Sequence, residues 1–435
     1  SDVYKRQRYK TKLLDCWDEA KQLIMKYYED YMRAHETGGI RWAGGTASFS
    51  AIPAGLGDDV YGLSGEPYGA IVAYNKDLAE ECHEAIEAKG YSRDLCSYMR
   101  NYWGSILLNK YVWGGEWPKP DFIWTTHLCC GHAKWYQVAG ELEGGVPFFC
   151  IDVSVGPYNE FNERKLNYVV SQVMDGIEWL EKVTGRKYND EKLIEAVYTE
   201  CLTSSLWAEI CTLNKAIPAP LDEKTMYTLQ AISALERRRK EHVDFYEKLR
   251  DEVRDRVANE IAAVANERFR VITDTQPPWA FLQLWRYLEK HGVVSIGSLY
   301  TFGLTGNFEV KDDGTWGPRT TPQEKGIEIE TREQALKILV EWGLSIPLGQ
   351  HYYSPELKSD MLKRIVEEWK VDGVMLHYNR GCEGLSLGIA ENKLALKKAG
   401  IPVMHFEGNM GDERGFDLEK TKAEVDVFLE ILGAK

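Results

Sequence analysis

The spacing of hydrophobic residues predicts a chain in which helices and short buried strands alternate. Apolar runs of strand character lie at 121–127, 147–153, 292–300, 372–378 and 401–408. Helical spacing is found at 8–37, 131–142, 385–400 and 418–432, through most of 163–268, and at 92–108, where Ser92 is the expected cap. This alternation indicates the α/β class with parallel sheets.

Two segments share one layout, although their residues do not repeat. In 121–153 and again in 372–408, a strand is followed by a cysteine-bearing loop, a helix, a glycine near a proline, and a second strand. Such units place their loops at the carboxyl ends of parallel strands, where open α/β sheets bind ligands. We therefore expect two doubly wound parallel-sheet domains of the Rossmann or flavodoxin type.

The expected division of the chain follows from these patterns. Residues 38–57 are rich in Gly, Ala and Pro, so 1–67 is expected to be an N-terminal helix and a glycine-rich loop region. The first α/β domain is expected at 68–180, a helical connecting region at 181–270, and the second α/β domain at 271–435.

Composition narrows the class of protein. The 435 residues include 53 Lys and Arg against 67 Asp and Glu, a net charge of −14, which argues against nucleic acid or an anionic membrane as the main partner. No apolar run is long enough for a membrane helix, and the start SDVYKRQRYK lacks the apolar stretch of a secretion signal. Nine cysteines in such a chain suit a reducing compartment, so we expect the cytoplasm.

Three of the cysteines stand out by position. Cys96, Cys129 and Cys382 lie at or just before predicted helix N-termini, where unpaired N–H groups stabilise a thiolate or a thiolate-bound iron–sulfur cluster. Two alternatives remain open. In the first alternative, all nine cysteines are ordinary small hydrophobic residues. In the other, zinc is held by a set of closely spaced residues: His127, Cys129, Cys130 and His132.

Other charged residues have both functional and structural explanations. Asp412 and Arg414 follow a predicted strand, and a turn held by a local ion pair is favoured over a catalytic role. The basic run 237–240 suits phosphate groups, but a solvated helix face is favoured. Four residues flank the cysteine loops and suit structural roles better than proton transfer: Lys134, His377, Arg380 and Glu383.

Five segments together resemble one protein family. They are YSRDLCSYMRNYWG, CCGHAKWYQ, PPWAFLQLWRYLEKHGVVSIGSLY, NRGCEGLSLG and GNMGDERGFDLEKTKAEVDVFLEIL. In content, order and spacing they are similar to the subunits of 2-hydroxyacyl-CoA dehydratases and of the related benzoyl-CoA reductases. The resemblance runs from about residue 85 to the C-terminus.

The resemblance implies a [4Fe-4S] cluster held in the interdomain cleft by Cys96, Cys129 and Cys382. Lys134 and Trp135 stand five and six residues after Cys129, as the family motif requires, so Cys130 falls on a variable position. The resemblance assigns no general acid or base here. A cluster with three thiolate ligands leaves one iron with an exchangeable position for a substrate carbonyl oxygen.

The implied activity is that of an oxygen-sensitive hydro-lyase subunit, which removes water from an (R)-2-hydroxyacyl-CoA through a ketyl radical to give an enoyl-CoA. The implied partners are a paralogous second subunit in a heterodimer and an ATP-dependent iron–sulfur activator. This chain itself has no P-loop motif, so ATP hydrolysis falls to the activator. Two alternatives remain: a benzoyl-CoA reductase-type subunit that reduces an aromatic acyl-CoA, and a non-catalytic iron–sulfur electron-transfer partner.

Overall fold

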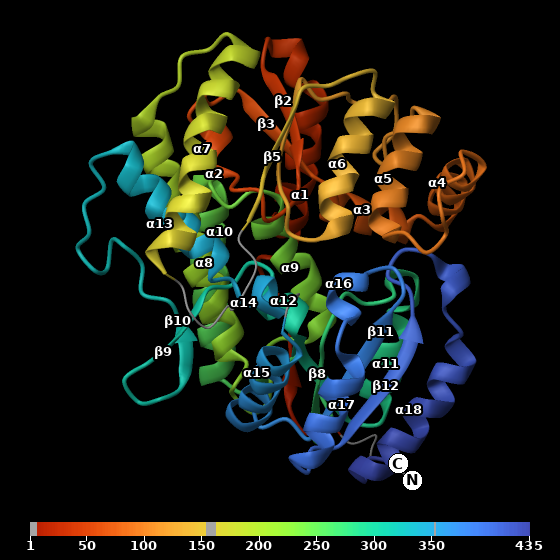
Figure 1. Ribbon diagram of the computed structural model, residues 1–435. Coiled ribbons are helices and arrows are strands. Elements are labelled where there is room, and N and C mark those ends of the chain that lie inside the picture. The colour runs from red at the N-terminus through yellow and green to blue at the C-terminus, as the bar shows by residue number, and fades with distance from the viewer. Residues whose placement is uncertain (1–6, 154–161, 352–353) are drawn as a thin grey trace.

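The computed structural model describes residues 7–153, 162–351 and 354–435, and within them two four-stranded parallel sheets organise the chain (Figure 1). The first sheet has the order β3-β2-β4-β5 and the second the order β12-β11-β7-β8. The first sheet consists of β2 (Ile40–Gly44), β3 (Val60–Ser64), β4 (Phe122–Thr126) and β5 (Phe148–Ile151). The second consists of β7 (Phe269–Thr273), β8 (Val293–Ser298), β11 (Gly373–Asn379) and β12 (Val403–Gly408).

The two sheets have the same strand order. In each, the second strand of the chain lies at one edge, the first lies beside it, and the third and fourth follow on the other side. The order reverses between β2 and β4 in the first sheet, and between β7 and β11 in the second. This confirms the α/β class and the parallel sheets, and it agrees with the shared layout of 121–153 and 372–408.

Helices cover both faces of the first sheet. Because side chains alternate along a strand, Trp42 packs on one face while Ala43 packs on the other. The Ala43 face meets α1 (Trp17–Arg33), α3 (Gly65–Tyr74), α4 (Lys76–Ala88), α5 (Ser97–Leu108) and α6 (Cys130–Leu142). The Trp42 face meets α2 (Ala51–Ala54), α7 (Glu163–Thr184), α8 (Asp190–Leu213) and α13 (Arg332–Leu344).

The second sheet is covered in the same way. Val374 and Leu376 of β11 pack on one face, and Met375 between them packs on the other. The first face meets α8, α9 (Glu223–Leu235), α10 (Lys240–Ala258), α12 (Leu299–Gly303), α15 (Pro355–Glu368) and α17 (Ile389–Lys398). The opposite face meets α11 (Gln283–Lys290) and α18 (Leu418–Leu432).

Shorter elements complete the described chain. β1 (Lys10–Thr11) pairs with β6 (Ile261–Ala262), and β9 (Phe308–Val310) pairs with β10 (Trp316–Pro318). The remaining helical turns are α14 (Pro347–His351), α16 (Glu383–Ser386), and 3₁₀ turns at Ala34–Thr37, Trp279–Phe281 and Glu413–Gly415.

The five strands predicted from apolar runs are all present, but the other three strands of the two four-stranded sheets were not predicted. β2 and β3 lie in the segment predicted to be a glycine-rich loop, so that prediction was wrong for both. A methyl group on Gly62 would lie 2.7 Å from the Trp42 ring, so a glycine inside β3 makes room for the neighbouring strand's indole. β7 directly follows the segment that was predicted to be helical up to 268. It contains Arg270, whose buried guanidinium donates to the Trp369 and Asn214 carbonyls.

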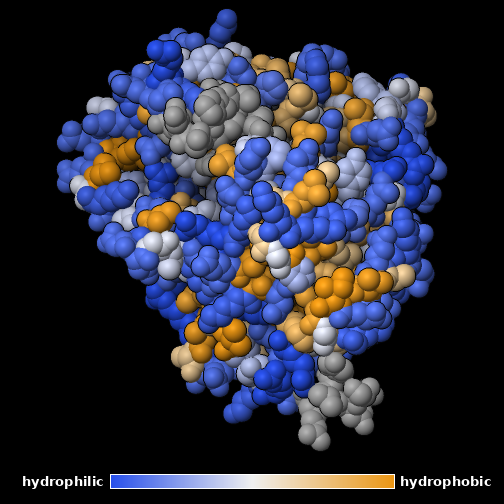
Figure 2. All heavy atoms as spheres, turned by 60° about the horizontal axis from the view of Figure 1, so that its bottom comes forward, coloured by the Kyte–Doolittle hydropathy of each residue, from blue (hydrophilic) through white to orange (hydrophobic). Residues whose placement is uncertain are grey.

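The outer surface is that of an acidic protein with scattered apolar residues. Figure 2 shows that the face at the lower end of Figure 1 is mostly hydrophilic, with separate hydrophobic patches. Exposed apolar side chains include Leu394 on α17 and Val427 and Ile431 on α18. Across the three described ranges, no helix is both long and apolar enough to cross a bilayer.

Candidate cofactor site at three helix N-termini

Each of the three singled-out cysteines is the residue that precedes the first turn of a helix. Cys96 is the N-cap of α5, Cys129 of α6, and Cys382 of α16. The structure thus confirms the predicted positions at helix N-termini, although α5 begins at Ser97 and its cap is Cys96 rather than Ser92. Cys129 follows β4 and Cys382 follows β11, the third strand of each sheet, beside the point where the strand order reverses.

The fold brings the three cysteine segments to one place. The Ser97 N–H donates to the Gly381 carbonyl at 3.2 Å, which joins the residue after Cys96 to the residue before Cys382. A methyl group built on Gly131 would lie 3.8 Å from both Cys129 Sγ and Cys96 Cβ. In Figure 1, α16 lies where the second group of strands meets the helices of the first. Residues that are 286 positions apart in the chain therefore share one site.

The surroundings of these thiols oppose deprotonation in the absence of a cation. Burial, and then the charge of Cys382, raises the pKa of the Cys129 thiol to about 12. Burial is also the main reason why the pKa values of Cys96 and Cys382 are raised. Backbone N–H groups of the first helical turns act in the opposite direction, and His132 N–H donates to Cys129 Sγ at 3.3 Å. A bound metal cation deprotonates such thiols outright, and the N–H groups are already aimed at the negative sulfurs that result.

The three N-cap residues offer thiolate donors, which are the usual ligands of iron–sulfur clusters. Within the described ranges, no three His, Cys, Asp or Glu side chains are close enough together to hold one ion. The zinc alternative has no support from His132, because the Thr126 carbonyl engages its Nδ1 at 2.6 Å and Glu66 engages its Nε2 at 2.9 Å. Cys130 is exposed. Three cysteine thiols at one site are compatible with the thiolate ligands of a [4Fe-4S] cluster.

A half-buried carboxylate beside these cysteines was not predicted from the sequence. Glu66, in the first turn of α3, pairs with His132 Nε2 at 2.9 Å and accepts from the Thr46 N–H at 2.9 Å. Burial opposes its charge, but His132 outweighs burial and lowers the pKa of Glu66, whose charge in turn raises the pKa of Cys129. A methyl group on Gly45 would lie 1.8 Å from His132 Nε2, so only glycine fits there. Nothing in the segment GEPYGA signals this role, which depends on tertiary contacts.

Neighbouring residues contact three of the four side chains that flank the cysteine loops. Lys134 is exposed and donates to Gln137, and Arg380 is exposed and pairs with Glu407. Glu383 is also exposed. His377 is buried, pairs with the Gln276 carbonyl at 2.7 Å and stacks on Phe406; burial lowers its pKa to about 4. The prediction that structural roles outweigh proton transfer at these positions agrees with these contacts.

The predicted ion pair of Asp412 and Arg414 is present and belongs to a larger network. The Arg414 Nε atom donates to Asp412 Oδ1 at 2.9 Å, and the Arg100 Nη2 atom donates to Asp412 Oδ2 at 3.1 Å. Arg100 lies on α5, one turn after Cys96, and is fully buried. Asp412 follows β12, so this network fastens the second sheet to the helix that carries Cys96.

The basic run 237–240 is not the solvated helix face that was predicted. Arg237 pairs with buried Glu200 at 3.2 Å, and Arg238 and Arg239 both pair with Glu236. Only Lys240 extends into solvent. These guanidinium groups join α8, α9 and the first sheet, so their charges are already matched inside the protein.

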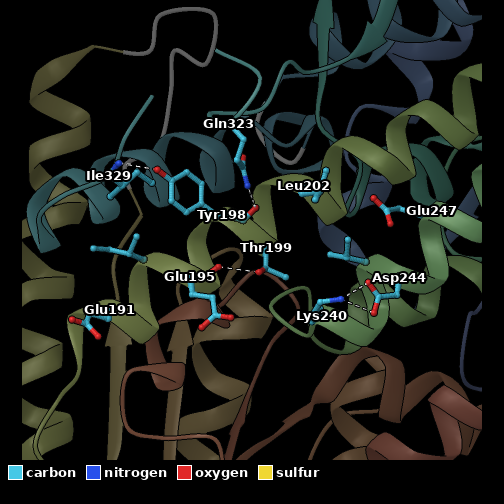
Figure 3. Close-up of a pocket in the computed structure, with 12 residues that line it drawn as sticks. Glu191, Glu195, Tyr198, Thr199, Leu202, Lys240, Asp244, Glu247, Gln323 and Ile329 are labelled. Atoms are coloured by element: carbon cyan, nitrogen blue, oxygen red, sulfur yellow. Dashed lines mark hydrogen bonds and ion pairs between the residues drawn. The ribbon is translucent and has the colours of Figure 1, made fainter. Parts of the chain in front are cut away.

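A wide cavity lies away from the cysteines. It has a volume of about 730 Å³ and lies between α8, α10 and the segment near Gln323 (Figure 3). Its rim carries Glu191, Glu195, Asp244 and Glu247, while Lys240 is paired with Asp244. None of the three N-cap cysteines lines it.

Comparison with known proteins adds the family context. Residues 64–432 match the family described as 2-hydroxyglutaryl-CoA dehydratase, D-component. The chain is 25% identical over 425 residues to the (R)-2-hydroxyisocaproyl-CoA dehydratase alpha subunit of Clostridioides difficile, covering 94% of each chain. It is 24% identical over 379 residues to the (R)-phenyllactyl-CoA dehydratase alpha subunit of Clostridium sporogenes, covering 85% and 84%. It is 26% identical over 328 residues to the (R)-2-hydroxyglutaryl-CoA dehydratase, subunit alpha, of Acidaminococcus fermentans, covering 73% of this chain and 61% of that one.

Proposed function

The chain belongs to the 2-hydroxyglutaryl-CoA dehydratase D-component family, and from this premise we propose that it is the alpha-type subunit of an (R)-2-hydroxyacyl-CoA dehydratase. The observation that carries the proposal is the meeting of Cys96, Cys129 and Cys382 at three helix N-termini. We further propose that the two sheets are the cores of two flavodoxin-like domains, with the cofactor between them.

In this proposal the three cysteines hold a [4Fe-4S] cluster. When bound, the cluster would supply the one-electron reduction of an acyl thioester that the ketyl-radical route to an enoyl-CoA requires. The chain's own residues supply the setting. The N–H groups of α5, α6 and α16 would stabilise negative charge on the sulfurs, and the Glu66–His132 pair would hold a proton beside Cys129.

The proposal includes partners and location. The relatives above are named as alpha subunits, which supports a second subunit for this chain. We propose that this subunit is paralogous, that a separate ATP-dependent iron–sulfur activator delivers the electron, and that the complex works in the reducing cytoplasm.

The test is anaerobic purification of the chain with its partner, followed by iron and sulfide analysis. We expect Cys96→Ala, Cys129→Ala and Cys382→Ala each to lose iron, sulfide and dehydration activity. Cys130→Ala is the matched control, because Cys130 is exposed and adjacent to a proposed ligand. If the three variants retained the parent's iron and activity, the proposed ligand set would be wrong.

A second assay separates the alternatives for the reaction. The activated complex is given a 2-hydroxyacyl-CoA and benzoyl-CoA in parallel, and consumption of each is followed. Turnover of the 2-hydroxyacyl-CoA alone supports the dehydratase. Turnover of benzoyl-CoA alone supports the reductase-type subunit. A stable cluster with turnover of neither supports the electron-transfer role.

A further inference from the structure

A small aromatic cavity lies beside the cysteine site. It has a volume of about 130 Å³ and is lined by parts of α1, α3, α9 and α12 together with Trp279. The Trp279 ring contacts the rings of Tyr74 and Tyr227, with centroid distances of 5.3 and 4.9 Å. Tyr74 is 51% exposed, so the cavity reaches the surface at that residue. No Asp, Glu, Lys, Arg or His is among the described residues that line it.

One hydrogen bond and two neighbouring positions connect this cavity to the cysteines. Pro67, which lines the cavity, directly follows Glu66 of the Glu66–His132 pair. The Trp279 indole N–H donates to the hydroxyl of Tyr98, two residues after Cys96. Tyr300 lines the cavity and belongs to the same buried core cluster as Cys382. The cavity therefore lies close to the segments that carry Cys96 and Cys382.

The size and lining of the cavity select for one chemical class. A cavity of about 150 Å³ lined by apolar side chains binds benzene, so about 130 Å³ accommodates a branched alkyl end or a single ring. The polar groups are few, and Gln230 already donates its amide N–H to the Tyr300 carbonyl at 2.9 Å. A carboxylate at the end of an acyl chain would be buried here without a cationic partner, which is costly.

We propose that this cavity binds the acyl chain of the substrate and selects branched aliphatic or aromatic 2-hydroxyacyl groups over those that end in a carboxylate. This inference rests on the proposed function, because that function supplies the acyl-CoA. Aromatic residues on three sides and the absence of a charged lining residue among those described are its basis.

The test is equilibrium binding of unreactive thioesters, which requires no turnover. The full chain, with the partner that co-purifies, is titrated by calorimetry with 4-methylpentanoyl-CoA, 3-phenylpropanoyl-CoA, glutaryl-CoA and free coenzyme A. We expect the first two to bind at least about tenfold more tightly than glutaryl-CoA, which corresponds to about 1.4 kcal/mol. Equal binding of glutaryl-CoA would overturn the proposed selectivity.

Two substitutions on α9 form a matched pair. Thr228 lines the cavity, whereas Thr225, one turn earlier on the same helix, does not. Thr228→Phe should reduce binding of both apolar thioesters to the level of free coenzyme A, and Thr225→Phe should leave it unchanged. Ala231 is a half-buried residue in the cavity wall, and Ala231→Leu fills less of the cavity than Thr228→Phe does. We expect it to weaken the binding of 3-phenylpropanoyl-CoA most.

The outcomes separate this inference from the proposed function. If the parent binds neither coenzyme A nor any thioester, the acyl-CoA function itself is contradicted. If the parent binds all thioesters and the two cavity-filling variants bind them equally well, the function stands and the acyl cavity is refuted. Loss of binding in Thr228→Phe and Ala231→Leu, with retention in Thr225→Phe, supports the inference.

Discussion

Gly381 is the position where one added methyl group should separate the cysteine segments. A Cβ atom on Gly381 would lie 2.4 Å from Ser97 Oγ and 2.5 Å from Asn409 Oδ1. Asn409 Oδ1 cannot turn away freely, because it accepts the N–H groups of Gly411 and Asp412 at 3.0 Å each. Gly381→Ala must therefore push the Cys382 segment away from the Cys96 segment, which it contacts.

The expected loss of stability follows from the steric overlap of the added Cβ atom with Ser97 Oγ and Asn409 Oδ1. Carbon atoms rest about 3.5 Å or more from their neighbours, so the segment must shift by about 1 Å. Overpacking of this kind costs about 1–3 kcal/mol, and we expect about 2 kcal/mol for Gly381→Ala. The measurement is urea unfolding of the metal-free chain followed by tryptophan fluorescence, with iron per chain after anaerobic reconstitution as the second readout. We expect a lower urea midpoint and less than about half of the parent's iron.

Gly131→Ala is the control at the same site. Its Cβ atom would lie 3.8 Å from Cys129 Sγ and from Cys96 Cβ, an ordinary contact distance. Gly131 is in α6, where alanine is favoured over glycine by about 0.5–1 kcal/mol, so this variant should be at least as stable as the parent. If Gly381→Ala matched Gly131→Ala in urea midpoint and iron content, the close approach of the two cysteine segments would be refuted.

Three further predictions concern buried ion pairs. Asp412→Asn leaves the buried Arg100 without its main carboxylate and should lower the free energy of unfolding by about 3 kcal/mol in urea titrations, whereas Arg414→Lys, at a partly exposed partner, should cost less. Burial opposes charge on Asp412, but the Arg414 hydrogen bond and the Arg100 charge hold its pKa far below the usual range. The parent's advantage over Asp412→Asn should therefore be full above about pH 5 and shrink as the pH falls below about 4; an advantage independent of pH would count against this. Lys358→Met leaves Asp274, which is fully buried, without its 2.8 Å partner and should cost about 3–5 kcal/mol, part of which Asp274→Asn in the same chain should restore, as measured by thermal unfolding.

The sequence predicted the elements whose signal is local. The strand at 372–378 is centred on the apolar residues 374–376, and the cysteines at 129 and 382 stand between a strand and a helix, so periodicity alone located them. The strands β2, β3 and β7 were missed because glycine in β3 and arginine in β7 conceal buried positions. Each of these residues is explained by a partner that is far away in the chain, such as Trp42 for Gly62.

In the candidate site, too, some residues were predicted from the sequence and others were not. The three cysteines were predicted to lie at helix N-termini, and they do; their role as cluster ligands stays a prediction. Glu66 was missed, because its significance comes from His132, which lies 66 residues further along the chain. The run 237–240 was misjudged for the opposite reason, since a dense group of arginines usually faces solvent and here neutralises Glu200 and Glu236.

The shared strand order of the two sheets has a consequence for assembly. Two of the three sulfurs belong to the first sheet and its helices, and the third follows a strand of the second sheet. Neither sheet with its helices supplies all three sulfurs. A cofactor bound by all three is therefore complete only after both parts have folded and packed against each other. The bound cofactor would then cross-link the two parts of the chain, and its loss would weaken their contact as well as stop the reaction.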